Sequence, residues 1–253
     1  IGEGVLATNN QSGNIVVGYG SVLSGVGNIK TISIGTSSAA NITGTTSLLN
    51  YGSNSLNSYV GSYTINIGND SHNVSSGNNN FFIGNNNSGN TGVNNFLFGN
   101  SIIGTSGSNN FICGNSLSIA AIDTSVILSS AFTGNTLSQS VVIGDGSANA
   151  IDSGTITAIG YRAGYKSVGT SSNTYIGNVS GYNNISGEFN TAIGRYSLYT
   201  STGDENTSCG SQSFYANSGS YSSTFGSRSY FGGGDKGSAF GYRALFAGSN
   251  NSC

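Results

Sequence analysis

The chain has 253 residues, and glycine, serine, threonine and asparagine together supply 143 of them. Only 6% of the residues are charged, the formal net charge is −2, and proline, methionine and tryptophan are absent. An ordinary soluble domain has about a quarter charged residues, and a disordered chain combines low hydrophobicity with high net charge, whereas this chain is 36% hydrophobic. The absence of proline excludes collagen. Because the chain begins at Ile1 and lacks methionine, we expect it to be a processed product or a part of a longer protein.

A short apolar motif recurs every ~16 residues, and we call its closing residue the anchor. Thirteen anchors are glycine, and two degenerate copies, SLLN and VILS, fill gaps of double length. The 15 anchors are Gly18, Gly35, Asn50, Gly68, Gly84, Gly99, Gly114, Ser129, Gly144, Gly160, Gly177, Gly194, Gly210, Gly226 and Gly241. The intervals between successive anchors are nearly uniform. A spacing this regular indicates a repeat protein.

A unit of ~16 residues is too short for a βαβ crossover, which needs about 30 residues. It can hold two short strands and two corners, so that successive coils pair with one another. The sequence therefore predicts an all-β parallel β-solenoid of about 15 turns over residues 14–247. Residues 1–13 are expected to form a lead-in segment and residues 248–253 a tail or a linker.

Three columns of the repeat carry structural expectations. The residue before the anchor is apolar in every copy and includes Cys113 and Cys209, which we expect to be small buried hydrophobic residues. Serine or alanine stands three residues after most anchors, but four consecutive copies differ, so the middle of the chain should be built differently. These four are Asn87, Ile102, Leu117 and Phe132. Asparagine recurs four residues before the anchor (for example Asn80, Asn95 and Asn110), and we expect stacked asparagines to hydrogen-bond side chain to side chain.

Several units between residues 80 and 145 are apolar at three consecutive positions, as in FFI and FLF. Continuous apolar runs indicate burial on both faces, whereas a narrow coil has only one interior. We therefore expect a homo-oligomer in which the middle residues form the seam between chains. These seam residues are Phe82, Leu97, Ile112, Ile127 and Val142.

Basic and tyrosine residues concentrate in the last third of the chain. Six of the seven basic residues lie between residues 162 and 243, and the arginines stand one or two residues after anchors. Tyrosine rings and arginine donors suit carbohydrate and anionic glycans, although solubility and the packing of tyrosine at corners are the simpler explanation. The candidate glycan or receptor contacts are Arg162, Arg195, Tyr196, Arg228, Tyr230, Tyr242 and Arg243.

Catalytic and metal-binding patterns are weak throughout the sequence. The single histidine, His72, lies in a polar turn, and the glycine-rich segment 232–237 lacks the spacing of a P-loop. We therefore expect no enzyme activity, no cofactor and no metal site. The negative net charge argues against nucleic-acid binding, and no apolar run approaches the ~18 residues of a membrane span, so no membrane insertion is expected.

Three segments, SNTYIGNVSGY (172–182), GEFNTAIGRYSLY (187–199) and GSAFGYRALF (237–246), resemble the repeats of YadA-like adhesin heads. Similar repeats occur in phage and giant-virus tail fibres. The resemblance implies a left-handed parallel β-roll, three identical chains side by side, exposure at a cell or virion surface, and no catalysis.

We therefore expect a structural, non-catalytic, extracellular or virion fibre segment that supports a receptor- or glycan-binding surface for host attachment or adhesion. The alternative is an extracellular filament subunit that polymerises head-to-tail, because open solenoid ends are templates for strand pairing.

Overall fold

The computed structural model describes residues 1–253 except 4–5, 8–12, 21, 24–29, 39–41, 44–46, 56–58, 72–74, 131, 152–153, 169–171, 233–234 and 248–253. Every regular element among the described residues is a β-strand. Internal contacts divide the chain into two compact units, Ile1–Asp123 and Thr124–Cys253. His72 and Cys253 lie outside the described residues.

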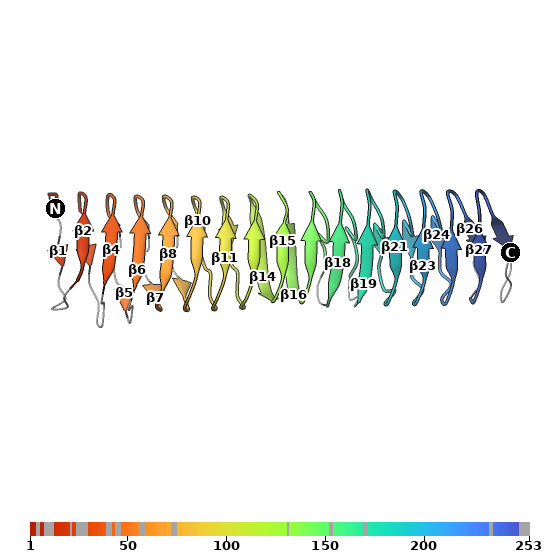
Figure 1. The fold of residues 1–253 in the computed structure, drawn as a ribbon, viewed down its shortest axis with the longest axis horizontal. Helices are drawn as coiled ribbons and strands as arrows, with labels where there is room; N and C mark the ends of the chain where they lie inside the picture. The colour runs from red at the N-terminus through yellow and green to blue at the C-terminus, as the bar shows by residue number, and fades with distance from the viewer. Residues whose placement is uncertain are drawn as a thin grey trace. The chain divides into compact units, whose positions relative to one another are not determined.

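The first unit contains a parallel sheet of main strands, each ending directly before an anchor except β6 (Leu48–Tyr51), which ends directly before Gly52 (Figure 1). Equivalent residues of successive coils pair in register, as Phe82 does with Leu97 and Leu97 with Ile112. The main strands of this unit are β2 (Ile15–Val17), β4 (Thr31–Ile34), β6 (Leu48–Tyr51), β8 (Thr64–Ile67), β10 (Phe81–Ile83), β11 (Phe96–Phe98) and β13 (Phe111–Cys113).

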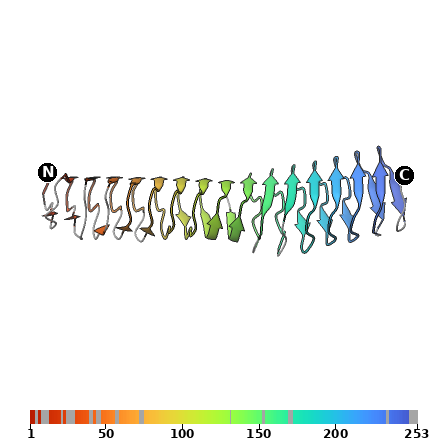
Figure 2. The same cartoon turned by 60° about the horizontal axis from the view of Figure 1, so that its bottom comes forward.

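A second set of parallel strands forms the other side of the coils, as the turned view shows (Figure 2), and all of those in the first unit except β14 (Leu117–Asp123) are only two residues long. In the first unit they are β1 (Leu6–Ala7), β3 (Val22–Leu23), β5 (Ile42–Thr43), β7 (Tyr59–Val60), β9 (Ser75–Ser76), β12 (Ile102–Ile103) and β14 (Leu117–Asp123). Two strands per coil joined by two corners is the arrangement that the repeat length predicts.

The second unit has the same construction. Its main strands are β15 (Val126–Leu128), β17 (Val141–Ile143), β18 (Ile156–Ile159), β19 (Asn173–Ile176), β21 (Thr191–Ile193), β23 (Thr207–Cys209), β25 (Ser223–Phe225) and β27 (Ser238–Phe240). Its other strands are β16 (Phe132–Ser138), β20 (Asn183–Asn184), β22 (Thr200–Ser201), β24 (Ala216–Asn217), β26 (Tyr230–Gly232) and β28 (Leu245–Ala247). The predicted fold class, an all-β parallel β-solenoid built from the short repeat, is confirmed.

One anchor was assigned wrongly from the sequence. Asn50 pairs with Ser33 inside the coil, whereas Gly52 occupies the anchor position between Gly35 and Gly68. The error arose because the copy LLNYG lacks a residue pattern that separates its inward from its outward positions. Solenoid bonding also begins inside the predicted lead-in segment, because the backbone N–H of Gly18 donates to the carbonyl oxygen of Ile1 at 2.9 Å.

Glycine is required at the anchor for two physical reasons. Gly194 has a φ of +127°, which side chains with a Cβ atom rarely adopt. A Cβ atom on Gly194 would also lie 2.5 Å from the carbonyl oxygen of Gly210 in the next coil. The repeated glycine therefore permits close approach of successive backbones as well as a special conformation.

The predicted seam residues lie inside the coils, which corrects their assignment. Phe82, Leu97, Ile112, Ile127 and Val142 are at most 1% exposed. Side chains alternate along a strand, so the middle residue of a three-residue strand points inward and its two neighbours point outward. Only one face of each apolar run lies inside the coil, as expected. The middle residue, which we assigned to the outer face, is the inner one, and the two flanking residues lie on the outer face.

Buried asparagines form a ladder, but they bond mainly to backbone groups rather than side chain to side chain as we expected from the sequence. Asn95 donates from its backbone N–H to Oδ1 of Asn80 at 2.9 Å and from Nδ2 to the carbonyl oxygen of Gly107 at 2.9 Å. Side-chain pairing occurs as well, for example from Nδ2 of Asn110 to Oδ1 of Asn95 at 3.0 Å. The asparagine side chains thus provide hydrogen-bond partners for backbone groups at a corner, where the strands do not pair these groups.

The middle copies differ as expected. Ile102, Leu117 and Phe132 are buried, and their segments form extended strands, of which β14 and β16 have seven residues each. Large apolar residues replace serine at this inward position, which therefore carries apolar packing rather than hydroxyl hydrogen bonds.

Candidate functional surfaces

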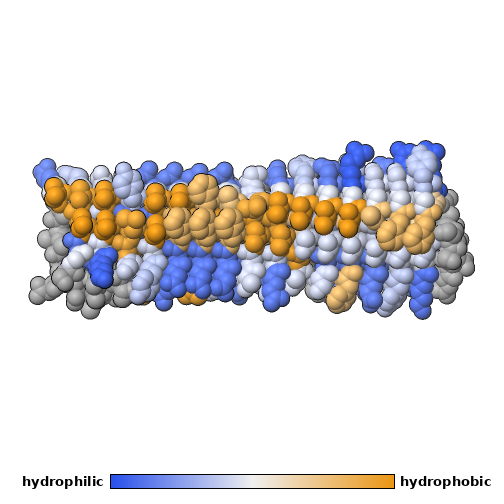
Figure 3. Space-filling model, in the orientation of Figure 1, coloured by the Kyte–Doolittle hydropathy of each residue, from blue (hydrophilic) through white to orange (hydrophobic). Residues whose placement is uncertain are grey.

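The outward residues of the main strands form an exposed band that we call the apolar stripe. They stand one and three residues before the anchors, and in Figure 3 they form the orange band over the main strands of each unit. Exposure reaches 52% at Ile15, 48% at Phe98, 40% at Ile193 and 57% at Phe240. Phe81, Phe96 and Phe111 stack ring on ring across three coils, with centroids 4.8 and 5.0 Å apart.

The stripe is wider in the first unit than in most of the second. From β18 onward the residue three before the anchor is threonine or serine, as at Thr157, Thr174 and Ser223, so only one apolar column continues. In the first unit, seven strands spaced ~4.8 Å apart and two columns ~7 Å apart give a patch on the order of 300 Å². The largest apolar patch on a typical soluble monomer is of about this size and often has a functional role.

Both described cysteines belong to the apolar stripe, so the expectation that they are buried is wrong. Cys113 and Cys209 are free thiols of intermediate exposure. They stand directly before an anchor, at the end of a main strand, where the alternation of side chains points them outward. The apolar column that suggested burial is the outer column of the sheet.

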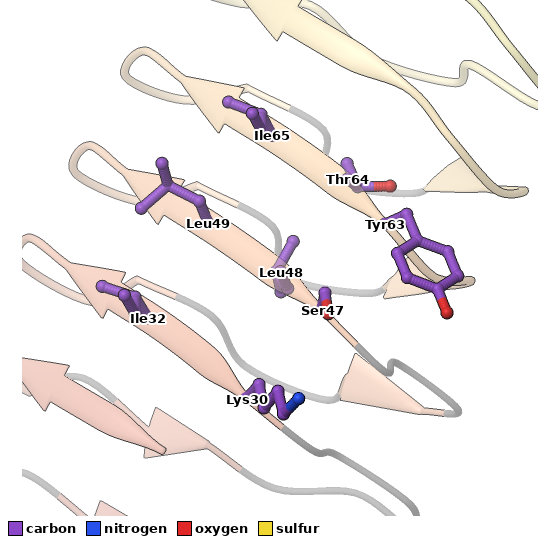
Figure 4. Close-up of a pocket in the computed structure, with 8 residues that line it drawn as sticks. All are labelled: Lys30, Ile32, Ser47, Leu48, Leu49, Tyr63, Thr64 and Ile65. Carbon is purple, nitrogen blue, oxygen red and sulfur yellow. The ribbon is translucent and has the colours of Figure 1, made fainter. Parts of the chain in front are cut away.

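A surface hollow of about 370 Å³ lies beside the stripe in the first unit (Figure 4). Ser47 is small where the neighbouring coils carry Lys30 and Tyr63, so the hollow opens between these two larger side chains. Its apolar lining comes from the stripe residues Ile32, Leu49 and Ile65 together with the buried Leu48.

The predicted contact arginines occupy one corner of the second unit. Arg162, Arg228 and Arg243 share the position two residues after the anchor, with φ between 51° and 56°. The guanidinium of Arg162 lies 5.1 Å from the ring centroid of Tyr161, and that of Arg243 lies 5.2 Å from the ring of Tyr242. Nε of Arg228 donates to Oε1 of Gln212 at 3.0 Å.

The remaining predicted contacts fall at the same corner or beside it. Arg195 lies 5.2 Å from the ring of Tyr196, which shares the corner position of Arg162. Tyr242 is 68% exposed. Tyr230 begins β26, and its side chain lies outside the part that the structure describes.

Sequence reasoning missed a second feature, a tyrosine ladder formed by Tyr165, Tyr182, Tyr199 and Tyr215. Each stands five residues after its anchor, and neighbouring rings stack at 5.2, 5.2 and 4.9 Å with interplanar angles of 8–12°. Arg162 lies 5.3 Å from the ring of Tyr165, and Tyr196 packs edge-on against Tyr199. The ladder therefore contacts two of the predicted contact residues, Arg162 and Tyr196. The regular column of tyrosine in the sequence was the signal that could have predicted the ladder.

Two tyrosines have perturbed ionisation. Burial raises the pKa of Tyr175 well above its usual range, although side-chain hydrogen bonds from Asn184 and Ser167 partly oppose the shift. In the ladder, partial desolvation raises the pKa of Tyr199, and the neighbouring Tyr215, Tyr182 and Tyr196 add to the increase. Phenolate formation on one ladder ring thus disfavours a second charge beside it.

Within the described ranges, no cluster of three or more histidine, cysteine, aspartate or glutamate side chains could hold a metal ion. In the same part of the chain, no helix has the length and apolarity needed to cross a membrane.

The fold and its surfaces define a parallel β-solenoid repeat protein with an exposed apolar stripe. We call its second surface, formed by Arg162, Arg195, Arg228 and Arg243 with the tyrosines beside them, the aromatic-basic corner. No protein-family model matches the chain, and no curated protein matches it either.

Proposed function

We propose that this chain is the β-roll segment of a non-catalytic extracellular or virion fibre, of the type found in YadA-like adhesin heads and in tail fibres. It assembles with identical chains through the apolar stripe. It presents the aromatic-basic corner of its second unit to a host-surface glycan or receptor.

The exposed apolar stripe carries this proposal. Each coil already contains a closed interior, with Leu97, Ile112 and Val142 fully buried. The additional apolar columns are therefore not needed to close the coil, and their exposure to water costs free energy at about 25 cal/mol per Å². Burial of the stripe against another copy of the same column removes this cost. The number of copies, three, follows from the resemblance of the repeats.

The corner supports the binding role by its chemistry. Arg162, Arg195 and Arg243 are exposed, and each guanidinium lies against a tyrosine ring, so their donors are held near apolar ring surfaces. Guanidinium groups pair with carboxylate or sulfate, and tyrosine rings contact sugar faces or edges. Several copies in one fibre would bind avidly.

The oligomer is tested by light scattering on the purified chain at micromolar concentrations, where we expect a trimer. Phe96→Asp places a charge in the stripe and should yield a monomer. Ser118→Asp, which adds the same charge at an exposed position of β14, should leave the trimer intact. A monomeric wild-type chain would contradict the proposal, and a mass that grows steadily with concentration would favour the head-to-tail filament.

The two stripe cysteines report the alignment of the chains. A short bis-maleimide should link Cys113 to Cys113 and Cys209 to Cys209 if the chains lie parallel and in register. Links between Cys113 and Cys209 would indicate an antiparallel or head-to-tail arrangement instead. Peptide mapping separates the two results because Arg162 and Arg195 provide cleavage sites between the cysteines.

Glycan binding is tested separately on an array of acidic and neutral glycans. We expect binding to acidic glycans that falls at least tenfold in the double variant Arg162→Ala, Arg195→Ala. The double variant Lys30→Ala, Lys166→Ala removes the same charge elsewhere and should bind normally. Unchanged binding in the arginine variant would remove the corner from the proposal without affecting the oligomer.

A further inference from the structure

The tyrosine ladder has a geometry that the binding role does not require. Its rings stand one per coil, and the backbone holds them in alignment, because the residue after each tyrosine donates to the carbonyl oxygen of the next tyrosine. The bonds run from Lys166 to Tyr182 at 2.8 Å, from Asn183 to Tyr199 at 2.9 Å and from Thr200 to Tyr215 at 3.0 Å. The strand pairs β20–β22 and β22–β24 continue the same register. Neighbouring ladder tyrosines therefore cannot drift apart while the coils remain paired.

The ladder is also open to solvent. Tyr215 is 41% exposed and the other three rings are half-buried. Stacking at about 5 Å covers the ring faces, so the ring edges and hydroxyls are what a reagent meets. Tyr221 and Tyr242 are more exposed, at 54% and 68%, but stack on no other tyrosine within the described residues. These two residues are built-in controls for exposure without stacking.

We propose that the tyrosine ladder is a site of oxidative cross-linking, at which neighbouring coils become joined by dityrosine bonds between Tyr165 and Tyr182, Tyr182 and Tyr199, or Tyr199 and Tyr215. The oxidant is hydrogen peroxide acting through a haem peroxidase. Each of two phenols loses one electron and one proton, and the two phenoxyl radicals form a carbon–carbon bond between their ortho carbons. Each ring then returns its ortho hydrogen to the phenolic oxygen. The peroxide takes up the two electrons and two protons and gives two molecules of water.

The fold favours this reaction because it supplies proximity in advance. Coupling of free tyrosines is bimolecular, whereas aligned groups in one molecule react with high effective molarity. The rings are open to solvent along their edges, so rotation about their side-chain bonds can bring ortho carbons of adjacent rings together. The resulting bond closes a loop that is one coil long. It therefore restricts the unfolded chain as a disulfide does.

The inference is independent of the proposed function and has its own experiment. The full chain is treated at low micromolar concentration with haem peroxidase and hydrogen peroxide, digested with trypsin and mapped by mass spectrometry. Coupling of Tyr165 to Tyr182 joins peptides 163–166 and 167–195, and coupling of Tyr182 to Tyr199 joins 167–195 and 196–228. Each joined pair should be lighter by two hydrogen atoms than the sum of its peptides. The melting temperature of the cross-linked chain should rise.

Tyr182→Phe keeps the stacked ring and removes the phenol that both links share. It should abolish both joined peptides and lower dityrosine fluorescence at least twofold, whereas Tyr242→Phe should change neither. In the wild-type chain, unfolding in urea before oxidation should spread the links over all tyrosines. Links formed as often at Tyr221 and Tyr242 as in the ladder, or found only between chains, would overturn the inference even if Tyr182→Phe failed to fold.

Discussion

Oδ1 of Asn173 accepts a hydrogen bond of 2.7 Å from the backbone N–H of Asn190, one coil further along the chain. Asn190 repeats this relation with Asn206 at 2.9 Å and also donates from Nδ2 to the carbonyl oxygen of Gly203 at 2.9 Å. The side chain of Asn190 thus serves two backbone groups at a corner, one as acceptor and one as donor. At these positions, polar side chains rather than apolar ones fill the interior of the coil.

Asn190→Ala should therefore destabilise the protein strongly. It leaves the N–H of Asn206 and the carbonyl oxygen of Gly203 without partners, at a cost of about 1–3 kcal/mol for each buried group. Asn178→Ala, at an exposed corner, should change stability by less than ~0.5 kcal/mol. Urea unfolding followed by circular dichroism measures both. Equal effects of the two substitutions would show that the buried ladder is not structural.

Phe82 and Phe81 should respond differently to truncation, although they are adjacent and chemically identical. Phe82 is 1% exposed inside the coil, whereas Phe81 is half-buried in the apolar stripe and stacks on Phe96. Phe82→Ala should cost about 3–5 kcal/mol of folding stability, and Phe81→Ala about 1 kcal/mol or less in the monomer. Phe81→Ala should instead weaken assembly, which light scattering detects. The reverse order of stabilities would contradict the assignment of the inner column.

Gly226→Ala and Gly241→Ala separate steric overlap from backbone strain. Both residues have similar φ, +124° and +119°, so both substitutions carry a strain of about 1–3 kcal/mol. A Cβ on Gly226 would lie 2.4 Å from the carbonyl oxygen of Gly241, whereas one on Gly241 meets nothing within 4 Å. We expect Gly226→Ala to lower the melting temperature clearly more than Gly241→Ala. Similar losses would mean that conformation alone explains the glycine.

Alkaline pH should destabilise the second unit through Tyr175. Its pKa is raised in the folded state, so its contribution is complete below the unfolded value of about 10 and is lost as the pH rises above it. The stability should fall by up to ~1.4 kcal/mol per pH unit for this group. Tyr175→Phe should be less stable at neutral pH, because Asn184 loses a partner, but should show a flatter alkaline slope.

The measurement for Tyr175 is the urea midpoint at about pH 8 and about pH 11. Tyr221→Phe, at an exposed corner, is the matched control and should retain the wild-type slope. An unchanged slope in Tyr175→Phe would assign the alkaline loss to other groups.

The short, regular period of the repeat was sufficient to predict a parallel solenoid, because a unit of that length has room only for two short strands and two corners. The same pattern predicted an asparagine ladder and the altered middle coils around Ile102 and Leu117, but not that these asparagines are buried and bond mainly to backbone groups. It failed at Asn50, because this copy lacks a clear motif and its anchor was placed two residues before the true anchor position, Gly52. The candidate arginines could be placed at one corner from their spacing, but the stacking of Tyr182 on Tyr199 depends on side-chain directions that spacing does not encode.

The sequence by itself determined the coil, because anchor glycines and alternating short strands are local properties of the repeat. Only the tertiary structure decided which side of each strand faces inward. Phe81, Phe82 and Ile83 are equally apolar, so hydrophobicity could not separate the core from the stripe. The corners that flank a three-residue strand turn its middle residue inward and leave the other two on the surface. The apolar columns that look most like a core are therefore exposed on the outer face of the main strands.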